Sequence, residues 1–230
     1  MRHILFLLLF ISIGFRSAAQ KDLDLIVNKV LDAMGGKEKL MSVTSVKKMG
    51  NIEFAGQKIP INYYAVHKMG ERTEFIFSGM TGYSIITKDS GFNFSPFNGQ
   101  TSPENVTAED VKLAQDELDL HGVLVDYKEK GYIVELLENE DVDGVEALQL
   151  KITISPNKTL YYFVDPAGYY IIRIKTVSIS NGQQNTNKTD FYNFKKTKEG
   201  VLFPFTYDNI TFDTIELNLP LEDKLFRATK

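Results

Sequence analysis

Apolar and polar residues alternate along most of this chain, the pattern of antiparallel strands with two different faces. Residues 123–166 show it most clearly and predict three strands in a row. In the second of these strands one face carries only aliphatic side chains, those of Leu148, Leu150, Ile152 and Ile154. Residues 160–164 are apolar or aromatic on both faces, so we expect other parts of the protein to cover each side of the sheet there.

The same period predicts strands elsewhere in the chain, separated by turn residues. We expect them at residues 43–54, 58–68, 72–79, 83–87, 169–179, 189–197, 201–207 and 210–219, with a short strand inside 89–99. Helical spacing predicts one helix over residues 21–34, ended by Gly35 and Gly36, and a second from a capping box at Thr107 to about Leu120. The result is a mostly β (α+β) chain of roughly ten strands and two helices. A twisted sheet of that size either closes into a barrel or stays open as a half-shell.

The first nineteen residues have the pattern of a secretory signal peptide. Arg2 and His3 precede an apolar run at residues 4–15, and small residues, Ser17 to Ala19, follow it. We therefore expect cleavage before Gln20, export to the periplasm, and a single domain over residues 20–230. An uncleaved membrane anchor is the alternative, although the run is short of the ~20 residues that a membrane-spanning helix needs.

Composition excludes several kinds of chemistry. The formal charge of −4 provides no basic surface for nucleic acid, and the absence of cysteine excludes disulfides and thiol catalysis. His67 and His121 stand outside any metal-ligand spacing. No nucleophile elbow, phosphate-binding loop or dinucleotide fingerprint is present. We expect no enzyme activity, no catalytic residue, no cofactor and no metal.

An acidic turn provides the one tempting metal motif. Asn139, Asp141, Asp143 and Gly144 match the first six positions of a calcium loop. The closing bidentate acid should follow at position 150, where the chain has Leu150. A hairpin turn is therefore the preferred interpretation, with calcium binding as the alternative.

An excess of apolar side chains remains to be explained. We predict that they line the concave side of the rolled sheet and form a ligand-binding cavity: Phe75, Phe77, Tyr83, Ile85, Leu148, Leu150, Ile152, Tyr162, Ile172, Ile174, Phe203 and Phe205, continued by Ile215 and Leu217. The alternative is an ordinary packed core. A wide rolled sheet can leave room that its side chains do not fill, and that favours a cavity for a hydrophobic ligand.

Several turn and strand patterns resemble the LolA-like outer-membrane lipoprotein-sorting proteins, in the form common among Bacteroidetes. They occur in the family's order over nearly the whole chain after residue 20, at residues 33–40, 77–81, 95–99, 126–131, 142–144, 161–165 and 203–205. The resemblance implies an unclosed antiparallel barrel with helices covering its concave side. It also implies a monomeric carrier that shields lipoprotein acyl chains between an inner-membrane exporter and an outer-membrane acceptor.

Two positions depart from the family pattern. Many relatives have Trp about where Phe92 stands, and the family's lid-holding Arg has only Lys68 or Arg72 nearby. Two other functions stay open. The first is a periplasmic or surface lipid-binding protein of the same fold that is not dedicated to lipoproteins. The second is an integral outer-membrane β-barrel, against which the two amphipathic helices and the charged C-terminus argue.

Overall fold

The computed structural model describes residues 22–229. The predicted signal peptide, residues 1–19, lies outside this range. Within it, no helix has both the length and the apolar character needed to span a membrane.

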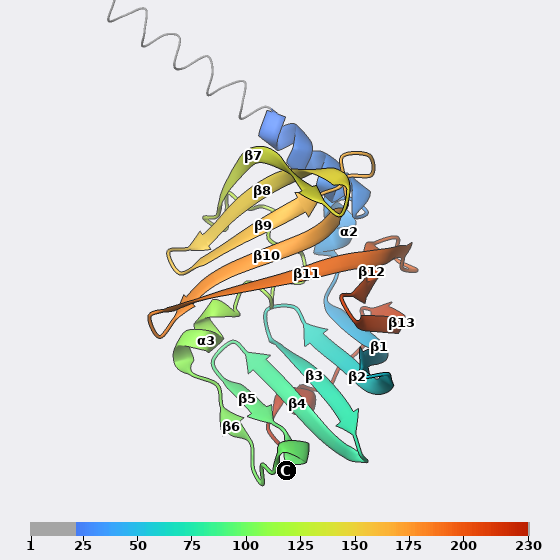
Figure 1. The fold of residues 1–230 in the computed structure, drawn as a ribbon, viewed down its shortest axis with the longest axis vertical. Coiled ribbons are helices and arrows are strands. Elements are labelled where there is room, and N and C mark those ends of the chain that lie inside the picture. Colours follow the sequence, from blue (N-terminus) through green and yellow to red (C-terminus); the bar gives the residue numbers. More distant parts are fainter. Residues whose placement is uncertain (1–21, 230) are drawn as a thin grey trace, which may run out of the picture.

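The described residues form one antiparallel sheet of thirteen strands that curls into an open half-shell (Figure 1). The strands are β1 (Ser45–Phe54), β2 (Gln57–Val66), β3 (Gly70–Phe77), β4 (Met80–Thr87), β5 (Gly91–Phe94), β6 (Glu104–Asn105), β7 (Ile133–Val142), β8 (Val145–Ser155), β9 (Lys158–Val164), β10 (Ile171–Ser180), β11 (Gln183–Lys196), β12 (Leu202–Tyr207) and β13 (Ile210–Leu217). The predicted strands are confirmed, with β6 and the longer β11 as additions.

Two meanders join to make this sheet. β1 pairs with β13, so the order runs β6-β5-β4-β3-β2-β1-β13-β12-β11-β10-β9-β8-β7. β6 and β7 are the two edges and do not pair with each other, which leaves the barrel unclosed, as predicted. The concave side is therefore open along one seam, and helices and loops fill part of it.

Turn chemistry sets the hairpin registers. The β7–β8 hairpin turns at Asp143 and Gly144, with φ of 52° and 89°. Positive φ at both central residues defines the type I′ turn, which Asp-Gly favours. The Gly144 N–H also bonds the Asp141 carboxylate at 3.2 Å, and Leu150 is fully buried. The acidic segment therefore forms a hairpin, as preferred from the sequence.

The N-terminal helix covers part of the concave face. Residues 22–33 are helical, and the short helix α2 (Lys37–Met41) follows. The apolar stripe of the first helix, Leu23, Val27, Val30 and Leu31, packs into the same core as Leu150 of β8. The N-terminal helix therefore packs on the core that Leu150 and its neighbours form.

The second helix is much shorter than predicted. α3 spans Ala108–Leu113, and its N-cap is Thr107, whose hydroxyl accepts the Asp110 N–H. A continued helix would offer the Glu117 N–H to the Leu113 carbonyl. Instead, the buried Nζ of Lys158 in β9 donates a hydrogen bond to that carbonyl oxygen at 2.7 Å. The chain therefore leaves the helix and runs through turns, here called the 114–132 loop.

The C-terminal segment, residues 218–229, covers the outer face of β3 and β4. It includes the short helix η2 (Asp223–Phe226). The Arg72 guanidinium donates to the Leu225 carbonyl at 3.2 Å, pairs with Glu74 at 2.7 Å and lies 4.1 Å from the Tyr83 ring centre. Arg72 therefore holds this segment on the outside of the half-shell, while the exposed Lys68 lies in the β2–β3 turn.

Candidate functional site

An apolar groove opens on the concave face at one end of β1, β2 and β3. Its volume is about 430 Å³, and its wall is aliphatic and aromatic apart from one serine. The lining side chains are Ile52, Phe54, Ile59, Phe75, Phe77, Ser95 and Phe97. Phe97 comes from the short helix η1 (Pro96–Asn98), which closes one side of the groove.

Strand register brings these residues together. Ile52 pairs with Ile59, and Ile61 pairs with Phe75, so alternate positions of three strands share one face. Phe77 meets Phe97 edge to face, with ring centres 6.1 Å apart. Phe54 and Phe77 are nevertheless 66% and 39% exposed. A contiguous apolar surface left open to solvent is typical of a binding site.

Polar groups lie further along the same face of β1 and β2. Lys48 pairs with Tyr63, four residues from Ile52 and Ile59 respectively, or about 13 Å at the usual strand rise. The Tyr63 hydroxyl donates to the Glu71 carboxylate at 2.9 Å. Burial, followed by the negative charge of Glu117, raises the pKa of Glu71 from 4.5 to about 7. The concave face thus changes from apolar to polar along its length.

A second cavity of about 420 Å³ lies between the 114–132 loop and strands β9 to β11. Its walls mix apolar side chains such as Leu160 and Ile174 with Thr176, Thr189 and an ion cluster around the buried Lys158, in which Glu117 is exposed. In that cluster the Lys158 Nζ lies 2.8 Å from both Asp116 and Glu117. Burial alone would lower the pKa of Lys158, but the charges of Glu117 and Asp116 outweigh it and raise that pKa.

A larger recess, of about 870 Å³, lies on the rim between α3 and the β8–β9 turn. Charged residues in its walls, among them Glu109, Lys112, Asp116 and Lys158, make it a poor match for an acyl chain. The groove at the ends of β1 to β3 is therefore the best apolar site on the concave side.

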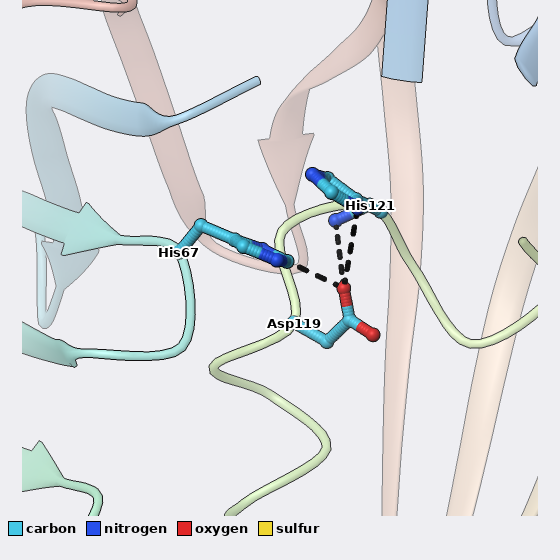
Figure 2. A group of neighbouring side chains, drawn as sticks. All are labelled: His67, Asp119 and His121. Carbon is cyan, nitrogen blue, oxygen red and sulfur yellow. Dashed lines mark hydrogen bonds and ion pairs between the residues drawn. The ribbon is translucent and has the colours of Figure 1, made fainter. Parts of the chain in front are cut away.

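His67 and His121 come together with Asp119, as Figure 2 shows. The two imidazole rings stack with centres 3.8 Å apart and planes 14° from parallel. One Asp119 oxygen lies 3.6 Å from the His67 Nδ1 and 3.9 Å from the His121 Nδ1, and it accepts the His121 backbone N–H. Sequence spacing could not find this cluster, because the β2–β3 turn and the 114–132 loop meet only in the folded chain.

The cluster has the composition of a metal site but not its geometry. Lone pairs of imidazole lie in the ring plane, so nearly parallel stacked rings cannot both direct one toward an ion ~2.1 Å away. The His67 Nδ1 already accepts the Leu120 N–H at 3.2 Å, and Lys130 neutralises Asp119 at 2.7 Å. Burial, then the charge of its neighbour His121, lowers the pKa of His67, and burial lowers that of His121. These contacts fasten the loop to the sheet.

Comparison with known proteins gives the fold a name. No family model matches the sequence, and neither does any curated protein. A LolA superfamily protein from Nitrosomonas europaea has a similar solved structure, with 14% identity, coverage of 86% of this chain and 97% of that one, and a TM-score of 0.51. This chain has a LolA-like fold. A DUF1329 family protein from Desulfovibrio piger is also similar, with 11% identity, coverage of 89% and 96%, and a TM-score of 0.53.

The LolA-like half-shell places most of the predicted cavity residues on its concave face. One cluster brings together Phe75, Leu148, Leu150, Ile152, Tyr162, Ile174, Phe203, Phe205, Ile215 and Leu217. Most of them lie in the packed core, and only Phe75 and Phe77 line the open groove. Tyr162 and Ile174 line the second cavity.

Three predicted residues lie on the opposite face. Tyr83 pairs with Glu74 and Ile85 with Arg72, on the outer side covered by the C-terminal segment. Ile172 packs with Phe163 in a separate outer cluster, next to a β-bulge in β10. Period two identifies which residues share a face but not which face is concave, so these placements in the cavity were wrong.

Proposed function

We propose that this chain is a periplasmic carrier that binds acyl chains, those of lipoproteins among them, in the groove between Ile52 and Phe97. Phe54 and Phe77 carry the proposal, because these large side chains stay exposed beside an apolar hollow. Each buried CH₂ of a ligand would contribute ~0.8 kcal/mol before ordering costs. The LolA-like fold supports the proposal by analogy only, since one fold can serve many functions.

Binding would need no covalent chemistry. The groove is lined by apolar side chains and one serine hydroxyl, so it can bury a hydrocarbon chain without leaving a charge unpaired. Its wall is built from three strands and η1, and the N-terminal helix packs against the other half of the concave face. A chain could therefore enter the groove without displacing that helix.

Two groove variants and one matched control test the proposal. Phe54→Glu and Phe77→Glu place a charge in the wall at exposed positions, so folding should persist. Ile133→Glu is the control, since Ile133 in β7 is 61% exposed, close to the 66% of Phe54. Delipidated protein is titrated with dansyl-undecanoate, a fluorescent acyl probe, and with decanol.

We expect the two groove variants to weaken binding of both ligands at least tenfold, which corresponds to about 1.4 kcal/mol. The control should bind like the wild type. Absence of binding to the wild-type protein, or equal losses in all three variants, would refute the groove as the acyl-chain site.

A further inference from the structure

The second cavity has a sheet wall on which polar and apolar side chains alternate. Two rungs of β9, β10 and β11 form this wall: Leu160, Thr176 and Asn187 in the first, and Tyr162, Ile174 and Thr189 in the second. All six side chains line the hollow, so hydrogen-bonding groups and hydrocarbon surface lie next to each other on one face. Such a wall suits a ligand that has both polar and apolar surfaces.

The Tyr162 hydroxyl is a buried polar group that opens onto this hollow. Tyr162 is only 8% exposed, yet its hydroxyl makes no hydrogen bond within residues 22–229. In that range the Thr197 Oγ1 is the only side-chain atom that is both shut off from solvent and unpartnered, so the Tyr162 oxygen must reach an open space. The second cavity is that space. Burial also raises the pKa of Tyr162, which keeps the hydroxyl a donor, and a buried donor needs a partner.

Three further polar side chains in this wall are unpartnered. Those of Thr176, Asn187 and Thr189 make no hydrogen bond within the described part of the chain. On the loop side of the hollow, one oxygen of the Glu117 carboxylate accepts from the Lys158 ammonium at 2.8 Å, and the Glu117 side chain is 56% exposed. The cavity thus offers neutral hydroxyl and amide groups on one wall and an accessible carboxylate on the other.

The charges around the cavity favour a neutral ligand. The Lys158 ammonium already donates to a backbone carbonyl and two carboxylates, so all three of its hydrogens are used. A ligand anion would find no free ammonium and would face the carboxylates of Asp116 and Glu117, whereas a ligand cation would lie near the Lys158 charge. An alkyl chain would cover the Tyr162 hydroxyl without giving it a partner. The remaining class is neutral and rich in hydroxyls, which is the chemistry of a sugar ring.

We propose that the second cavity binds a neutral sugar ring. Its hydroxyls would bond to the hydroxyls of Tyr162, Thr176 and Thr189, and its C–H surface would pack on Leu160 and Ile174. The volume of about 420 Å³ is near the lower end of the ~300–1,000 Å³ usual for small-molecule sites, which suits one or two rings. This site shares no lining residue with the acyl-chain groove, so it is a second function and does not depend on the first.

The test is an NMR titration of isotope-labelled protein, in which the amide shifts report both affinity and location. The ligands are methyl glucoside and methyl galactoside, with glucosamine as the cationic and gluconate as the anionic counterpart. Tyr162→Phe and Thr176→Val each remove one hydroxyl from the cavity. Tyr161→Phe and Thr159→Val are the matched controls, since these neighbours in β9 alternate with Leu160 and Tyr162 and lie on the outer face. Thermal unfolding checks that each variant is folded.

We expect saturable shifts with a methyl glycoside, concentrated at residues 116–123, 158–162 and 174–191. Tyr162→Phe and Thr176→Val should each weaken binding about three- to tenfold, the range for one neutral hydrogen bond, and the controls should bind like the wild type. Absence of saturable shifts with every ligand would mean that water alone fills the cavity and would overturn the proposal. Tighter binding of glucosamine or gluconate, or unchanged affinity in Tyr162→Phe, would overturn it as well.

A sugar ring can belong to a free sugar or to the head group of a glycolipid. Octyl glucoside, titrated into the Phe54→Glu variant so that the acyl-chain groove is impaired, separates the two sources. Tighter binding of octyl glucoside than of methyl glucoside would support a glycolipid head group, and equal affinity would support a free sugar. Failure of the sugar proposal would leave the acyl-chain proposal standing, because the ligands, variants and lining residues differ.

Discussion

Replacing Glu71 by Gln should stabilise the protein at alkaline pH and have little effect at acidic pH. Burial on the concave face, with the charge of Glu117 nearby, raises the pKa of Glu71 from 4.5 to about 7. The unfolded chain therefore loses its proton near pH 4.5 and the folded chain only near pH 7. Stability from this group is fully present below pH 4.5 and is lost as the pH rises to about 7.

The magnitude follows from that difference. A change of one pH unit in a pKa corresponds to 1.36 kcal/mol, so a pKa moved from 4.5 to about 7 gives an upper limit of about 3 kcal/mol. Partial contact of the Glu71 side chain with solvent makes the actual loss of stability smaller than this limit, and we expect a loss of about 1–3 kcal/mol. Gln is neutral at every pH, and its amide oxygen can still accept the hydrogen bond from the Tyr63 hydroxyl. The variant therefore does not lose stability when the pH rises above 4.5, as the wild type does.

Urea unfolding followed by circular dichroism at pH 4.5, 6 and 8 measures the effect, since the chain has no Trp to serve as a fluorescent reporter. The variant should gain stability relative to the wild type steadily from pH 4.5 to pH 8. Glu146→Gln, at an exposed position in β8, is the control and should show a constant difference. If Glu71→Gln also gave a constant difference, the assignment of a raised pKa to Glu71 would be wrong.

Two further predictions concern the 114–132 loop. Lys158→Ala should lower the free energy of unfolding, measured in urea, by about 3–5 kcal/mol, because Asp116 would stay buried without its cation. A decrease of less than about 1 kcal/mol would contradict this interpretation of the ion cluster. His121→Phe should lose less stability than the wild type between pH 7 and pH 5. The lowered pKa values of His67 and His121 make the folded wild type lose stability as the pH falls below about 6.5, and the variant has only one of these two histidines. Parallel curves of unfolding free energy against pH for the two proteins would refute the prediction.

Local patterns predicted most of the fold. Strand alternation and turn residues such as Asp143 and Gly144 act between neighbours in the chain, so the hairpins follow from the sequence. The end of α3 does not, because Lys158, 45 residues beyond Leu113, takes the carbonyl that would have continued the helix. A partner that distant leaves no local signal.

The site was harder to predict than the fold. Phe75 and Phe77 were identified from their alternation, but Phe54 and Phe97 were not, because only strand pairing and η1 bring them to the groove. The available signal in the sequence was the alternation of Ile52 and Phe54, with Ile59 across the predicted hairpin, which places all three on one face. Lys48 and Tyr207 are 159 residues apart in the chain, so the hydrogen bond between them forms only in the folded structure.

Cross-linking of a diazirine-labelled acyl chain, mapped by peptide mass spectrometry, tests the central claim most directly. The groove account predicts modified residues within 52–59, 75–77 and 95–97, with labelling competed away by unlabelled decanoate and decanol. Labelling concentrated at 160–162 and 174–191, around the second cavity, would contradict it, and so would labelling that neither competitor reduces.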